Sequence, residues 1–326
     1  VQLLQSYWFI KSDHLGKLGV GLQSSASDNA AILVDGSGSL VPANWVMFDY
    51  NAFLLRNTNS NTISGLNWQQ VGGFCFGGGG AGGDCFGAPR DSIRYDSPTF
   101  GGFSVSASWG EDDFWDVSAR YSGEYNGFKL AAAAAYSQWS QDFFSGQTDV
   151  LVGPGFIEVG DDRWIDYFQV GAYVEHVPTG LWLYGAYGHI DPDGVTAPTI
   201  GVDGAIALGG LDRAGGDTYY IKGGLRERWH PLGHTVLYGE YEKFDGADSD
   251  FLANALISAS TQLWGLGVVQ EIDAAAMSLW ISYRHIDADL KGAGCADATQ
   301  TDAMGLDVGC GTDAFQYIKA GALINF

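Results

Sequence analysis

Much of the chain alternates between apolar and polar side chains with a period of two residues. Residues 103–109 carry Phe, Val, Ala and Trp at every second position with serines between them, and residues 115–122 repeat the pattern after a Gly-Glu-Asp-Asp turn. Successive side chains of a β-strand point to opposite faces, so each run predicts a strand with one apolar face. The apolar rows are capped by Trp or Tyr at one end and by Phe near the other. This is typical of a membrane barrel with its apolar face toward lipid, whereas a soluble β-sandwich would bury that face.

Composition favours the barrel over a helical membrane protein. The chain has 326 residues, of which 48 are Gly and 14% are aromatic, and its mean hydropathy is −0.01. No run reaches the roughly 18 apolar residues that a membrane helix needs. Only helices and closed barrels satisfy all backbone hydrogen bonds in lipid, so a membrane protein of this composition is an all-β, transmembrane antiparallel β-barrel.

The pattern predicts thirteen strands in one domain, residues 1–326. Their ranges are 2–10, 15–22, 90–95, 103–109, 114–122, 128–137, 164–176, 181–189, 218–229, 235–244, 262–271, 276–286 and 314–326. Short connections alternate with mostly long ones, as in outer-membrane barrels with short periplasmic turns. This regularity argues against the soluble sandwich. Because an even-stranded barrel has both termini in the periplasm, the alternation implies either an odd number of further strands before Val1 or an unusual barrel that starts at Val1, and we favour the missing strands.

The segment 23–89 is too long for an ordinary connection. Residues 46–56 and 63–71 within it could be two extra strands or parts of a loop, and we favour a loop inserted into the barrel.

If the apolar positions face lipid, the opposite positions face the lumen. The basic residues assigned to the lumen are Lys17, Arg90, Arg94, Arg120, Lys129, Lys222, Arg226, Arg228, Arg284 and Lys319. The acidic ones on the strands are Asp116, Glu175, Glu240 and Glu242. A Lys or Arg facing lipid costs about 2–4 kcal/mol at the midplane, which explains the placement without any function. The functional interpretation is a basic stripe that shapes the field along a water-filled path.

Four cysteines lie in two loops, as the pairs Cys75 and Cys85, and Cys295 and Cys310. Their even number and pairwise proximity among Gly and Asp residues predict two local disulfides in an oxidising compartment. A metal site is the alternative, but Cys-x-x-Cys spacing and nearby histidines are lacking.

Charge and motifs restrict the chemistry further. The net charge of −22 argues against a nucleic-acid partner. The oxygen spacing of Asp245, Asp248 and Asp250 is compatible with calcium, although the Gly and terminal Glu of a helix-loop-helix calcium site are absent. The six histidines are scattered, and neither a nucleophile elbow nor a phosphate-binding loop is present. We therefore predict no catalytic residue, no enzyme activity and no cofactor, with calcium at these aspartates left open as an alternative.

Two stretches resemble the Gram-negative trimeric porins. Residues 90–103, Arg-Asp-Ser-Ile-Arg-Tyr-Asp-Ser-Pro-Thr-Phe-Gly-Gly-Phe, are similar to the strand–turn–strand unit after the constriction loop. Residues 319–326, Lys-Ala-Gly-Ala-Leu-Ile-Asn-Phe, resemble the C-terminal signal of outer-membrane barrels.

The resemblance implies a sixteen-stranded homotrimeric channel. Three strands would then precede Val1, and 23–89 would be the constriction loop, folded into the lumen. Arg90 matches the start of a wall strand that supplies a basic residue in this family. The loop acids that would face the basic wall are Asp28, Asp35 and Asp49. The Pro-Glu-Phe-Gly-Gly motif of enterobacterial members is absent, and the cysteine pair inside the loop is a further departure.

The predicted function is passive diffusion of small hydrophilic solutes and ions across the outer membrane of a Gram-negative bacterium. The predicted partners are these solutes, two further copies of the chain, outer-membrane lipid and lipopolysaccharide. One alternative is a channel specific for anions or sugars that uses the basic stripe with lumenal Tyr167, Tyr173 and Trp280. The other is a plugged structural or enzymatic barrel.

Overall fold

The computed structural model describes most of the strands and part of the long connections. The described residues are 4–44, 53–56, 58, 63–68, 89–111, 113–140, 150–151, 156–157, 164–193, 199–200, 206–207, 216–248, 257–292 and 311–324. Asp49, Asp250 and all four cysteines lie outside these ranges, so the predicted disulfides stay predictions.

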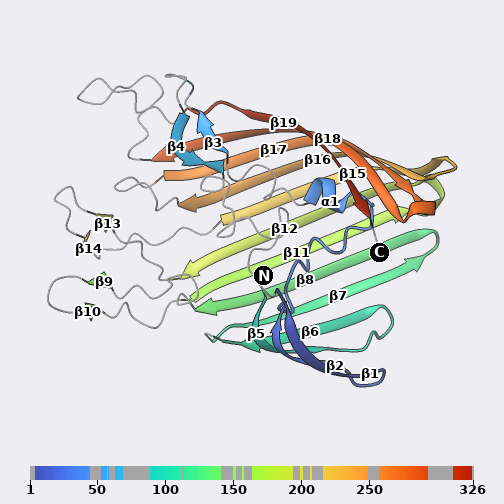
Figure 1. The fold of residues 1–326 in the computed structure, drawn as a ribbon, viewed down its shortest axis with the longest axis horizontal. Coiled ribbons are helices and arrows are strands. Elements are labelled where there is room, and N and C mark those ends of the chain that lie inside the picture. Colours follow the sequence, from blue (N-terminus) through green and yellow to red (C-terminus); the bar gives the residue numbers. More distant parts are fainter. Residues whose placement is uncertain are drawn as a thin grey trace.

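One antiparallel sheet of thirteen strands dominates the structure (Figure 1). Its strands, in order across the sheet, are β1 (Ser6–Ser12), β2 (Gly16–Gln23), β5 (Arg90–Asp96), β6 (Phe103–Gly110), β7 (Trp115–Tyr125), β8 (Phe128–Ser140), β11 (Trp164–His176), β12 (Leu181–Asp193), β15 (Gly216–His230), β16 (Gly233–Asp248), β17 (Ile257–Ile272), β18 (Met277–Gly292) and β19 (Phe315–Ile324). Each strand pairs with its neighbour in sequence order, so the thirteen predicted strands are confirmed. Several extend further toward the long connections than predicted, because backbone pairing continues beyond the apolar band whose alternation marks the strand.

Tight turns join the strands at one end of the sheet. Asn126 and Gly127 connect β7 to β8 with φ of 50° and 79°, as a two-residue hairpin of mirror-image type requires. Two 3₁₀ turns, Val177–Thr179 and Asp273–Ala275, serve the same purpose between β11 and β12 and between β17 and β18.

The two faces of the sheet differ as the alternation predicts. The outer face exposes large apolar side chains along its whole width, for example Val105 at 54%, Ile221 at 50% and Leu266 at 58%. An apolar surface of this extent suits lipid contact rather than water. The opposite face, called the inner face below, carries the polar and charged positions.

Closure of the barrel is not seen in the described residues. β1 and β19 lie at the two edges of the sheet, and no described backbone pairing joins them (Figure 1). The predicted barrel of sixteen strands therefore stays a prediction. Within the described ranges, no helix is long and apolar enough to cross a membrane.

In the described part of the segment between β2 and β5, the elements are short. The helix α1 (Leu40–Asn44) contacts β18, and the strands β3 (Leu54–Arg56) and β4 (Ile63–Asn67) pair with each other outside the main sheet. Both strand-forming stretches proposed for 46–71 thus contain a strand, but neither adds to the sheet. Two further short pairs are β9 (Val150–Leu151) with β10 (Phe156–Ile157), and β13 (Thr199–Ile200) with β14 (Ile206–Ala207).

Candidate functional site

The segment 24–44 lies against the inner face and is fixed there by side chains of the strands. On β7, Asp116 accepts a 2.6 Å hydrogen bond from the backbone amide of Ser27. On the neighbouring β6, Ser108 accepts one of 3.0 Å from the amide of Ala26. Asp116, predicted as a lumenal acid, is only 1% exposed and therefore anchors this segment.

Gln169 of β11 is an anchor that the sequence reasoning missed. Its amide nitrogen donates to the carbonyl of Ser27, and its amide oxygen accepts from the amide of Ala31, both at 3.0 Å. The hydroxyl of Tyr184 on β12 donates to the carbonyl of Ala31 at 2.8 Å. The available signal was an uncharged Gln at an inner position, between the inward-facing Tyr167 and Tyr173 of the same strand.

Apolar packing reinforces these hydrogen bonds. Ala30, Val34 and Ala43 belong to one buried cluster with inner-face side chains of β8 to β17, including Tyr173 and Trp182. The approach is so close that a Cβ atom at Gly171 of β11 would overlap the carbonyl group of Ala31. The inner face here is consequently covered, whereas the sequence predicted a hydrated surface.

Lys222 of β15 forms a buried ion pair with the covering segment. Its Nζ lies 2.6 Å from Oδ2 of Asp35 and 2.6 Å from Oδ1 of Asn44, and neither charged side chain is exposed. The rings of Trp182, Tyr184 and Tyr238 lie 5.6 to 5.8 Å from the same ammonium. A predicted loop acid and a predicted wall base are thereby brought into direct contact.

Arg284 of β18 forms the second buried pair of this region. Its Nε lies 2.8 Å from Oε1 of Glu240, whose other oxygen accepts from Tyr220 at 2.7 Å. The guanidinium also donates to the carbonyl of Ala43 at the end of α1. Glu242, on the same strand as Glu240, is 9% exposed. We refer to Lys222, Asp35, Arg284 and Glu240 as the buried latch.

Asp28 faces a different part of the basic wall. Its carboxylate interacts with Arg94 of β5 and Arg120 of β7, and Arg94 also donates to the carbonyls of Ser24 and Ser25. Burial raises the pKa of Asp28 above its ordinary value, while the hydrogen bond from Ser24 and the two arginines oppose that rise. Arg94 stays 20% exposed and pairs with Asp96 at 2.8 Å. We refer to Asp28, Arg94 and Arg120 as the hydrated triad.

Arg90, expected to face the constriction acids, is instead buried. Its guanidinium lies 3.7 Å from the ring centre of Trp139 and 4.4 Å from that of Phe114, and the residue is 1% exposed. Stacking on aromatic faces stabilises a guanidinium away from water. This contact joins the start of β5 to β8 and to the residue preceding β7.

The remaining wall charges are more exposed, and most are paired with acids. Glu271 accepts hydrogen bonds from Arg226 and lies 3.2 Å from Nδ1 of His234. Arg228 pairs with Asp273 at 2.6 Å, and Lys129 lies 3.9 Å from Glu175. Lys17 lies over Tyr7 and Phe9, and Lys319 over Trp280. Much of the predicted basic stripe is thus offset by neighbouring carboxylates.

The described residues give no support to the alternative of a calcium site at these aspartates. Asp245 accepts a 2.8 Å hydrogen bond from Lys243, and no group of three or more potential metal ligands occurs within the described ranges. Asp250 lies outside them, and nothing is described of the Asp248 side chain.

Comparison with known proteins identifies the family. A sequence model described as Gram-negative porin matches residues 4–310. The search of curated proteins gives no significant match.

Among solved structures, the anion-selective porin from Comamonas acidovorans is 12% identical with a TM-score of 0.50, and the match covers 97% of this chain and 76% of that one. Outer-membrane expressed OmpT of Vibrio cholerae is 14% identical, with 98% and 80% covered and a TM-score of 0.48. Salmonella typhi OmpF in complex with daunomycin is 13% identical, with 98% and 78% covered and a TM-score of 0.46. At these identities the likeness concerns the fold alone.

Proposed function

Because the chain belongs to the Gram-negative porin family, and is therefore an outer-membrane β-barrel channel, we propose that it carries small hydrophilic solutes and ions by passive diffusion. The observation that carries the proposal is the attachment of segment 24–44 to the charged inner face. A segment held there narrows the water-filled path and places a carboxylate, that of Asp28, opposite Arg94 and Arg120.

The proposed mechanism needs positioning and charge, without a covalent step or a cofactor. The hydrated triad sets a local field between a carboxylate on the segment and two guanidinium groups on the wall, and this field orients water and permeating ions. The buried latch holds the segment in place and is itself shielded from the path. Residues 23–89 are the proposed constriction element, of which 24–44 form the described anchor.

Weak cation selectivity is proposed in preference to anion selectivity. The pairs Arg94–Asp96, Lys222–Asp35, Arg226–Glu271, Arg228–Asp273 and Arg284–Glu240 offset much of the positive charge on the wall. The whole chain carries a net charge of −22, so the mean potential favours cations.

A channel specific for anions or sugars is less well supported. The aromatic residues predicted for such a path include Tyr167 and Tyr173, which are 1% and 4% exposed. Rings covered in this way do not offer their faces to a passing solute. The proposed assembly is a homotrimer, in line with the trimeric porins that residues 90–103 resemble.

Single-channel recording of the purified protein in a planar bilayer tests the proposal. The expected result is conductance that rises in proportion to salt, in steps grouped by three, with a reversal potential showing weak cation preference. Strong anion preference or a flux that saturates with one solute would favour a specific channel. Absence of conductance from correctly folded protein would reject the open-channel proposal.

A further inference from the structure

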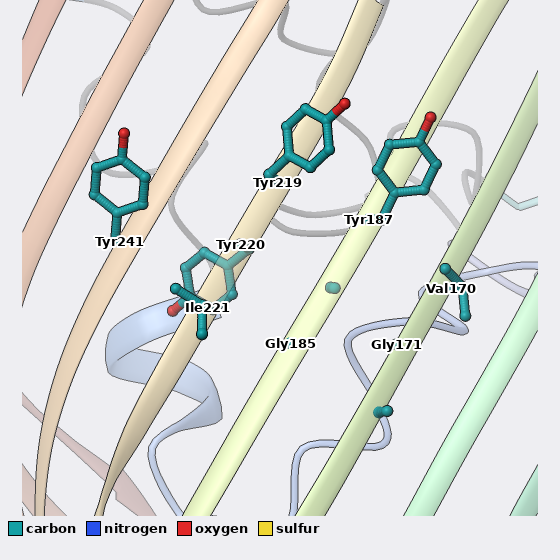
Figure 2. Close-up of a pocket in the computed structure, with 10 residues that line it drawn as sticks. Val170, Gly171, Gly185, Tyr187, Tyr219, Tyr220, Ile221 and Tyr241 are labelled. Carbon is teal, nitrogen blue, oxygen red and sulfur yellow. The ribbon is translucent and has the colours of Figure 1, made fainter.

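The outer face carries a groove between β11, β12, β15 and β16. Its volume is about 540 Å³, and its lining includes Ala172, Gly185, Tyr187, Tyr219, Ile221 and Tyr241 (Figure 2). Gly185 causes the depression, since its register partners are Ala172 on β11 and Ile221 on β15. Ala172 has a small side chain and Gly185 has none, so together they leave a gap in a face otherwise covered by large apolar residues.

The groove has an apolar part and a polar end. Figure 2 shows Tyr187, Tyr219 and Tyr241 in a row on neighbouring strands, with their hydroxyl groups pointing the same way, away from Gly185 and Ile221. The rings of Tyr187 and Tyr219 lie 5.2 Å apart. Tyrosines at this position mark the level where hydrocarbon meets headgroups, because the ring is apolar and the hydroxyl needs a polar partner.

Charged groups lie immediately beyond the tyrosine row. Asp217 accepts hydrogen bonds from Tyr187 at 2.6 Å and lies 2.9 Å from Nδ1 of His189. Lys243 is the register partner of Tyr219 and pairs with Asp245, with both side chains at least 36% exposed. An ammonium group therefore stands beside the polar end of an apolar groove.

We propose that this groove seats one acyl chain of a phosphate-bearing membrane lipid, whose phosphate lies beside Lys243. The outer face of an outer-membrane barrel is continuous with the bilayer, so hydrocarbon is the medium that meets the groove. From the apolar floor through the tyrosine row to the charged rim, the polarity of the groove increases in the same order as that of a lipid from its acyl chain to its phosphate. Within a bilayer, the favourable free energy of lipid binding comes from van der Waals packing rather than from the removal of water. An acyl chain in the groove makes contacts that a void would lose.

A substitution that fills the groove with a side chain of the protein tests the proposal. A Cβ atom at Gly185 would meet only the carbonyl oxygen of Tyr220, at 3.7 Å, so Gly185→Leu is accommodated and occupies the space. Gly239→Leu is the matched control. It adds the same side chain to the outer face of β16, with ordinary contacts of 3.4 Å to Leu266 and 3.9 Å to Gly265, and Gly239 is outside the groove.

The measurement is native mass spectrometry of the folded full-length protein in detergent, titrated with palmitoyl-oleoyl phosphatidylglycerol. Gly185→Leu is expected to weaken retention of the first lipid at least tenfold, and Gly239→Leu less than twofold. Lys243→Gln is expected to weaken it severalfold by removing the ammonium beside the phosphate. Unchanged bilayer conductance of all three variants shows that each is folded and separates this proposal from that of the channel.

Three outcomes would overturn the proposal. Equal lipid retention by Gly185→Leu and Gly239→Leu would show that the groove holds no acyl chain. Unaltered retention by Lys243→Gln would refute the assignment of the phosphate. A change in the number of chains per particle with Gly185→Leu, without loss of bound lipid, would identify the groove as a contact between copies of the chain.

Discussion

The buried latch and the hydrated triad both join the segment 24–44 to basic residues of the wall, but they differ in their access to water. In the latch, the side chains of Lys222, Asp35, Arg284 and Glu240 are all 0% exposed. In the triad, Asp28, Arg94 and Arg120 are all partly exposed, and the side chain of Arg94 is 20% exposed. The same combination of carboxylate and cation therefore serves two purposes. In the buried latch it fixes the position of the segment, and in the hydrated triad it acts on the ions that pass through the channel.

The difference follows from the dielectric surroundings of each group. A buried charge without its partner is costly, so the latch resists separation of the segment from the wall. Near water the same pair contributes little to stability, but its field reaches the path. Variants of the two groups should consequently have different effects, one mainly on structure and the other mainly on selectivity.

Lys222→Met should have the largest effect, because it leaves Asp35 buried and uncompensated. Breaking a buried pair costs about 3–5 kcal/mol, which should loosen segment 24–44. Hydrogen exchange at the amides of Ala31 and Ser37 should accelerate, and single-channel conductance should become larger and noisier.

The double variant Lys222→Met/Asp35→Leu is the control for this loss. Replacing both charges by apolar side chains is often neutral for stability. The double variant should therefore restore protection of the two amides against exchange. If Lys222→Met alone exchanges and conducts like the wild type, the latch does not hold the segment in place.

Gln169→Leu should have the second largest effect. It removes two hydrogen bonds to the segment and leaves the carbonyl of Ser27 and the amide of Ala31 without that partner, at a cost of about 2–3 kcal/mol. The denaturant midpoint and the exchange rate of Ala31 measure the loss. Gln262→Leu, on the outer face with one 3.3 Å hydrogen bond from Tyr241, should change neither by more than a fraction of this amount.

Asp28→Asn should alter selectivity while leaving the segment in place. A unit charge about 6 Å from an ion in water contributes about 0.7 kcal/mol, so its removal should shift the permeability ratio toward anions about threefold. Reversal potentials in a salt gradient measure the shift. An unchanged ratio would mean that the triad does not face the conducting path.

The pH dependence of the same residue has a defined sign. Because burial raises the pKa of Asp28, it takes up a proton at a higher pH than exposed carboxylates do. Lowering the pH should shift the wild type toward anions at a pH above that at which exposed carboxylates titrate, and Asp28→Asn should lack this step. The folded state gains stability from Asp28 as the pH falls through its raised pKa, and this gain is complete only below the ordinary pKa of 3.8.

Arg228→Ala should have the smallest effect. Its pair with Asp273 is about half exposed, and exposed pairs contribute about 0–1 kcal/mol. Neither the denaturant midpoint nor the conductance should change measurably, and a large change in either would show that exposure does not separate the two groups.

The sequence by itself determined the strand pattern and the identity of the two faces. A period of two is a property of the extended backbone, so Val105, Ile221 and Ile281 could be assigned to lipid without coordinates. The parity also placed Lys222, Arg284 and Asp116 on the inner face correctly. These inferences are local, because each depends on residues a few positions apart.

Tertiary structure alone decided what covers the inner face. The contact between Lys222 and Asp35 spans 187 residues, and that between Gln169 and Ala31 spans 138. No periodicity encodes such distances, so Gln169 went unnoticed and Arg90 was assigned to the wrong surroundings. Polar residues on the inner face stay hydrated or become buried according to where segment 24–44 lies, and burial in turn determines whether a charge holds the fold or acts on the path.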